Sequence, residues 1–101
     1  DSVAFAEQIE NNMQQLMEKG CYVKQVNYSV YDFDAERDKW IYKVWITYED
    51  QKTGDVFVTE QKFIHFNMKM YVIEGEEAVV ITKKSGEELT EFEKLAVNMF
   101  K

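Results

Sequence analysis

Residues 39–49 contain the pattern that most narrows the folds open to this chain. Side chains alternate in two sets along this segment: Trp40, Tyr42, Val44, Ile46 and Tyr48 in one, and Ile41, Lys43, Trp45, Thr47 and Glu49 in the other. A period of two, with many aromatic and β-branched residues, predicts a β-strand. A single strand or hairpin is marginal in water, so the rest of the chain must supply the strands of a sheet.

The segments on either side of this strand supply its expected partners. Residues 22–33 alternate in the same way, with Val26, Tyr28 and Val30 on one side. After a loop at residues 49–55, in which Gly54 can take a positive φ, residues 56–66 form the expected return strand. Glu60 and Lys62 interrupt its alternation, which indicates either a bulge or bend at residues 60–62 or exposure at a fraying end.

A second hairpin is predicted from residues 68–74 and 78–84 around the turn at residues 74–77. The apolar run at residues 78–81 is typical of a strand covered on both faces.

Helices are expected at both ends of the chain. In residues 3–19 the apolar positions recur every three or four residues: Phe5, Ile9, Met13, Leu16 and Met17. Residues 86–100 show a second stripe, and Ser85 with Glu88 has the form of a capping box. The sequence therefore predicts one α+β domain over residues 1–101: an N-terminal helix, an antiparallel meander sheet of four to five strands and a C-terminal helix.

Composition excludes several classes of function. The net charge of −7 disfavours direct nucleic-acid binding, and the chain has no apolar run long enough to cross a membrane. Its first residues lack the form of a signal peptide, although one could have been removed. Cys21 is the single cysteine and is expected to be a small apolar residue rather than a reactive thiol. A cytoplasmic location is the expectation.

No motif in the chain carries an enzymatic chemistry. The alternating acids from Asp32 to Asp38 resemble a calcium loop, but Arg37 stands where that loop needs Gly and Lys43 where it needs Glu. His65 has no partner at a zinc-like spacing, and no phosphate-binding glycine loop is present. We expect no enzyme activity, no cofactor and no metal.

The aromatic content of the sheet is the one feature above background. Trp40 and Trp45 have opposite parity, so a regular strand places them on opposite faces. Two helices can cover only one face of so small a sheet. The other face carries either scattered exposed aromatic residues or an interface, and the residues expected at that interface are Ile41, Trp45, Phe57 and Phe63.

Three segments of the chain form a recognisable combination: Phe5-x-x-x-Ile9-x-x-x-Met13, residues 23–30, and Ile46-Thr47-Tyr48. In these segments the chain resembles the short sporulation-associated and phage-borne proteins of Gram-positive bacteria. The resemblance implies a Gram-positive or phage source and transfers no functional residue.

The leading hypothesis is a non-enzymatic protein-binding module, an inhibitor or regulator encoded by a phage or mobile element. The alternative is a small-ligand pocket beneath a helix in a cystatin-like or nuclear-transport-factor-like fold. A homodimer through the uncovered sheet face or an edge strand is also expected.

Overall fold

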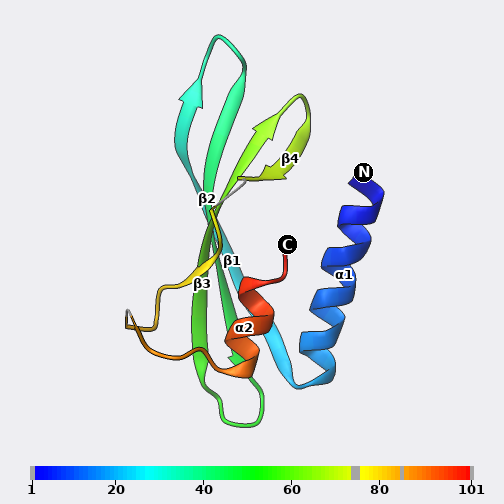
Figure 1. Cartoon of the computed structure of the whole chain (residues 1–101), viewed down its shortest axis with the longest axis vertical. Coiled ribbons are helices and arrows are strands. Elements are labelled where there is room, and N and C mark those ends of the chain that lie inside the picture. The colour runs from blue at the N-terminus through cyan, green and yellow to red at the C-terminus, as the bar shows by residue number, and fades with distance from the viewer. Residues whose placement is uncertain (1, 74–75, 85, 101) are drawn as a thin grey trace.

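The computed structural model describes residues 2–73, 76–84 and 86–100, with side chains described for Glu7 and from Ile9 onward. The elements in chain order are α1 (Ser2–Glu18), β1 (Cys21–Asp34), β2 (Lys39–Asp50), β3 (Val56–Phe66), β4 (Lys69–Val72), β5 (Val79–Val80) and α2 (Glu91–Val97). Strands β1 to β4 form an antiparallel meander, and β5 adds to β3 (Figure 1). The predicted α+β class, with a helix at each end of the chain, is confirmed.

Short polar turns join the long strands because aspartates satisfy the exposed backbone. The Asp34 carboxylate accepts the N–H groups of Glu36 and Arg37, at 3.1 and 3.4 Å. At the β2–β3 loop, Asp50 accepts the N–H of Lys52 at 2.9 Å, and Gly54 takes a φ of +77°.

Of the explanations expected for the interrupted alternation at residues 60–62, the bulge is wrong. The β2–β3 register runs unbroken from Trp40 opposite His65 to Glu49 opposite Val56. The irregularities lie in β1 instead, at Lys24 and Tyr31. Glu60 and Lys62 interrupt the apolar pattern because both side chains enter ion pairs on one sheet face.

The predicted second hairpin is also wrong. β4 pairs with β3 through a two-residue turn at Asn67 and Met68, whose φ values are +52° and +64°. β5 pairs with β3 further along the same edge, not with β4. Residues 74 and 75 of the expected turn lie outside the described residues. The run at residues 78–81 was expected to be covered on both faces, but Val79 and Ile81 are about half exposed.

The C-terminal helix starts later than predicted. Thr90 is the N-cap of α2: its side chain accepts the Glu93 N–H, and the Glu93 carboxylate accepts the Thr90 N–H. The predicted cap, Ser85, lies outside the described residues. Gly86 has a φ of +87°, which a helix cannot continue through. Two segments, Ser85 with Glu88 and Thr90 with Glu93, fit the capping pattern, and α2 begins at the second. Ala96 of this helix is buried in the core.

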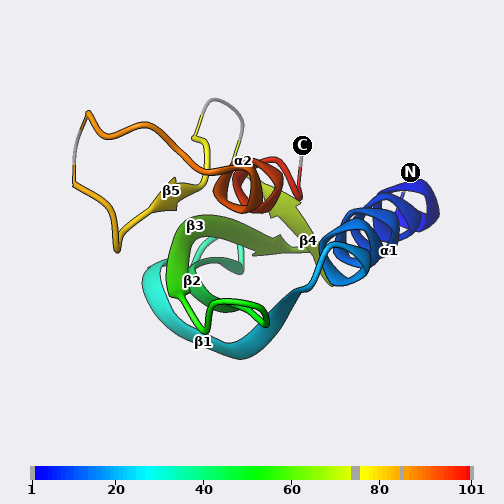
Figure 2. The ribbon, with the colours of Figure 1, turned by 90° about the horizontal axis from the view of Figure 1, so that it is seen from below.

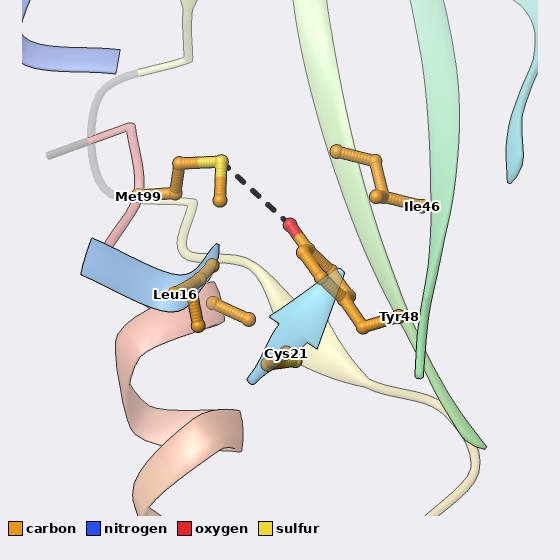
Figure 3. Close-up of a cluster of buried hydrophobic side chains, with 6 residues drawn as sticks. Leu16, Cys21, Ile46, Tyr48 and Met99 are labelled. Carbon is orange, nitrogen blue, oxygen red and sulfur yellow. Dashed lines mark hydrogen bonds between the residues drawn. The ribbon is translucent and has the colours of Figure 1, made fainter. Parts of the chain in front are cut away.

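Both helices pack on one side of the coiled sheet (Figure 2). They bury the core cluster of Leu16, Cys21, Ile46, Tyr48, Ala96 and Met99 (Figure 3). The Tyr48 hydroxyl donates to the Met99 sulfur at 3.7 Å, and burial is the main reason that its pKa rises to about 12. Each large core side chain contributes about 2–3 kcal/mol through burial.

The register divides the sheet into two faces. The Trp40 face carries the β2 residues of even number, Trp40 to Tyr48, and the β3 residues of odd number, Phe57 to His65. The Trp45 face carries the β2 residues of odd number, Ile41 to Glu49, and the β3 residues of even number, Val56 to Ile64. Trp40 and Trp45 therefore lie on opposite faces, as the alternation predicted.

Candidate functional site

The helices cover only half of the Trp40 face. The covered half lies around Ile46 and Tyr48, and Phe63 closes it by an edge contact with Phe100. The other half lies on the parts of β1, β2 and the β3–β4 hairpin that project past α2 (Figure 1). The open half comprises Val26, Tyr28, Val30, Phe33, Trp40, Tyr42, His65 and Met70.

A ladder of aromatic rings organises the open half. The Phe33 ring lies 4.0 Å from the Trp40 ring, centre to centre, and Trp40 stacks on Tyr42 at 6.5 Å. Tyr28 meets Tyr42 edge-on at 6.0 Å. These contacts hold the rings in place, and they leave Tyr28 72% and Phe33 43% exposed while Trp40 and Tyr42 are partly buried. The result is a preorganised apolar surface.

A shallow groove of about 300 Å³ runs across this surface. Its lining is almost entirely apolar and consists of Val26, Tyr28, Tyr42, Val44, His65 and Met70. Among the described residues, His65 and the two tyrosines are the ionisable side chains of that lining, and none of them is a carboxylate.

An acidic turn borders the open half. It comprises Asp34 at the end of β1 and the connection to β2, which carries Glu36 and Asp38 together with Arg37. Arg37 pairs with Asp34 at 3.7 Å, so most of the negative charge of this turn stays available to a partner. The apolar surface thus has an acidic border.

The Trp45 face has a different chemistry. The Trp45 indole N–H donates to Glu60 at 3.1 Å, and Lys43 pairs with the same carboxylate at 3.3 Å. The Nζ atoms of Lys43 and Lys62 lie 5.0 and 4.3 Å from the centre of the Tyr31 ring. These side chains cover the middle of the Trp45 face, and their charged groups contact one another or the Tyr31 ring.

The predicted interface residues do not come together. Ile41 and Trp45 lie on the Trp45 face, whereas Phe57 and Phe63 lie on the Trp40 face. Phe63 is buried, and Phe57 stacks on Tyr48 at 5.0 Å within the covered half. The grouping of these four residues into one patch is therefore corrected. Their odd numbers place Phe57 and Phe63 on the same face of the sheet, which is the face away from Trp45.

The residues of the open half were missed as a group. Val26, Tyr28 and Val30 were visible as one parity of a strand. The sequence does not show how far along the strand the helices cover the face that these residues share. The alternation is the same along covered and open parts of the strand, so only the position of α2 distinguishes them.

Cys21 is buried in the core, beside Tyr48 and beneath α1 (Figure 3). Burial, with a smaller contribution from the Asp50 carboxylate, raises the pKa of its thiol to about 11. A thiol in this state is a poor nucleophile at neutral pH. This placement matches the expected role of a small apolar residue.

The described part of the chain contains no group of three or more histidine, cysteine, aspartate or glutamate side chains arranged to hold a metal ion. No helix there combines the length and apolarity needed to cross a bilayer.

The chain has also been compared with known proteins. No protein-family model, no curated protein and no solved structure matches it. Function must therefore be inferred from the side chains of the two sheet faces.

Proposed function

We propose that this chain is a non-enzymatic protein-binding module and that the open half of the Trp40 face is its binding surface. The observation that carries the proposal is the ladder from Phe33 through Trp40 and Tyr42 to Tyr28, in which ring contacts hold the aromatic residues in place while Phe33 and Tyr28 stay exposed. Rigid aromatic residues at an exposed apolar patch are the usual anchors of protein interfaces, since they bury much area at a small cost in side-chain entropy.

The chemistry of this surface favours one kind of partner. An apolar segment of the partner would lie across Tyr28 and Met70, which are exposed. Lysine or arginine residues at the end of that segment would face the acidic turn at residues 34–38. The net charge of −7 would speed the encounter with such a basic partner.

This binding would make the chain an inhibitor or regulator of another protein. A phage or mobile-element origin stays part of the proposal and is supported by the resemblance described above. A cytoplasmic location is supported by the free, buried Cys21, which forms no disulfide. Homodimerisation is a separate proposal and does not depend on this binding surface.

A pull-down from a native lysate with matched surface variants tests the proposal. Phe33→Ser with Met70→Ser alters two side chains of the open half that are 43% and 46% exposed. Tyr71→Ser with Val56→Ser is the control, because these side chains are 45% and 44% exposed and lie on the Trp45 face. The first pair should abolish capture of a specific protein, and the control should retain it.

Two results would count against the binding surface. Capture that survives Phe33→Ser with Met70→Ser, or that is lost equally in the control, would move the interface elsewhere. Trp45→Ala extends the comparison: loss of capture in that variant alone would favour the interface around Ile41 and Trp45.

A small-ligand site is the second candidate, and the apolar groove is the observation that favours it. Its volume of about 300 Å³ is at the lower end of ligand pockets. The groove lies on the open half, beyond the core beneath the helices. Titration with indole, followed by NMR, would test it: shifts at Val44 and His65 that saturate below about 1 mM support a pocket. Shifts that rise linearly without saturation contradict it.

A further inference from the structure

β1 is the terminal strand of the sheet, and one of its edges carries no other strand among the described residues. Irregularities at Lys24 and Tyr31 bracket a regular stretch, residues 25–30, in which every residue is exposed. This stretch has no charge, no proline and no glycine. Edges of this kind usually carry a lysine, a proline or a bulge that prevents pairing with another chain. Here the bulges lie only at the two ends.

Backbone hydrogen bonds show which residues face that edge. The Gln51 N–H donates to the Gly20 carbonyl at 2.8 Å, and the Asp50 N–H donates to the Asp55 carbonyl at 2.9 Å. Odd-numbered residues of β2 therefore point their backbone groups to β1, and even-numbered ones to β3. Trp45 lies opposite Asn27 and Lys43 opposite Ser29. It follows that Asn27 and Ser29 bond to β2, whereas Val26, Tyr28 and Val30 direct their N–H and C=O groups outward.

We propose that two copies of this chain pair through the outer edge of β1, as antiparallel strands with Tyr28 on the two-fold axis. In this register Val26 of one copy lies opposite Val30 of the other, and Tyr28 lies opposite its counterpart. All three residues present an outward N–H and C=O, so the pair forms hydrogen-bonded positions along the whole stretch.

Charge selects a second copy over an unrelated strand. Just beyond each end of the paired stretch, Lys24 of one copy and Asp32 of the other come to the same end, and both side chains are exposed. The stretch between them is uncharged, so no acidic side chains face each other there although the chain has a net charge of −7. Opposite charges at facing positions stabilise strand pairs, whereas like charges oppose them.

The two-fold axis also joins the apolar surfaces. An axis perpendicular to the sheet keeps the Trp40 faces of both copies on the same side. The open halves then become one continuous surface with Tyr28 of each copy at its centre. The pairing does not depend on the partner-binding proposal, because it rests on the backbone edge of β1.

Light scattering and sedimentation equilibrium over a range of concentrations test the pairing. The unaltered chain should reach a dimer. Tyr28→Lys puts two like charges opposite each other and should raise the dissociation constant at least about tenfold. Met68→Lys adds the same charge at a turn residue that is 91% exposed, and should leave the dissociation constant unchanged.

Charge reversal tests the register itself and needs no change at Tyr28. Lys24→Asp and Asp32→Lys should each weaken the dimer, and the double variant should restore it. Tyr28→Cys should cross-link two copies under mild oxidation, since hydrogen-bonded positions have Cα atoms about 5.5 Å apart. Met68→Cys should not.

Three outcomes would overturn the pairing: a monomer at every concentration up to about 1 mM, a dimer indifferent to Tyr28→Lys, or charge reversals that are not restored in the double variant. Circular dichroism of each variant separates loss of pairing from loss of folding.

Discussion

The two halves of the Trp40 face are both rich in apolar and aromatic side chains, but one is buried beneath the helices and the other is exposed to solvent. In the covered half, Tyr48 is fully buried against Met99, and Ile46 lies beside it. In the open half, Tyr28 and Phe33 occupy equivalent positions in the alternation and remain exposed. One strand pattern therefore serves both as a core and as a surface. The difference comes from the helices, whose position sets where burial ends.

The largest expected contrast is between Tyr48→Ala and Tyr28→Ala. The first leaves a cavity and unpaired polar groups in the core, and should cost about 3–5 kcal/mol of unfolding free energy. The second removes an exposed ring and should cost less than about 1 kcal/mol. Urea titration measures both. Equal losses in the two variants would mean that the open half is as much a part of the core as the covered half.

Thiol reactivity should separate the halves by about two orders of magnitude. The Cys21 thiol has a pKa of about 11, and it is buried. A thiol introduced by Val30→Cys lies on the open half and should have an ordinary pKa near 8.5. At pH 8, an aromatic disulfide reagent should modify position 30 rapidly and Cys21 slowly. Rapid modification of Cys21 in the native protein would show that the covered half opens readily.

Breaking the ion pair that anchors α2 should lower the unfolding free energy by an amount between these extremes. Lys83 donates to Glu93 and also to the Glu88 carbonyl at 2.6 Å, and both charged side chains are largely buried. Lys83→Met leaves the Glu93 carboxylate buried with one partner fewer, and should cost about 2 kcal/mol. Lys94→Met is the matched control. Its exposed pair with Glu91 should contribute less than about 0.5 kcal/mol.

The same pair gives a pH dependence of known sign. Burial alone would raise the pKa of Glu93, but hydrogen bonds from Lys83 and Thr90 outweigh it and the pKa is lowered. A lowered pKa stabilises the fold above the unfolded-state value of about 4.3, and this stabilisation is lost as the pH falls through the folded-state value. The stability gap between the unaltered chain and Lys83→Met should therefore narrow in acid. A constant gap from pH 7 to pH 3 would contradict this account.

The smallest expected change in stability comes from the β3–β4 turn, which adjoins the open half. Asn67 and Met68 both have positive φ, a conformation that asparagine tolerates and methionine does not favour. Met68→Gly should raise the unfolding free energy by about 0.5–1 kcal/mol. Gly54→Ala, at a φ of +77°, should lower it. Thermal melts of both variants measure the two signs, and a destabilising Met68→Gly would show that the turn is not strained.

The strands and the faces of Trp40 and Trp45 could be predicted because each depends on local alternation. The β3–β4 turn could not, because Asn-Met lacks the Asn-Gly pattern that marks such turns. The start of α2 was ambiguous in the same way: Ser85 with Glu88 and Thr90 with Glu93 both have the capping pattern. The positive φ of Gly86 and the two hydrogen bonds between Thr90 and Glu93 mark the second as the start of the helix.

The sequence by itself determined an α+β chain with long aromatic strands, and it determined which side chains share a face. These properties follow from a backbone period of two, which neighbouring residues specify. Only the tertiary structure decided that the helices stop halfway along the Trp40 face and that charged side chains cover the Trp45 face. Both depend on where segments distant in sequence come to rest, so the open aromatic surface appears only once the chain is folded.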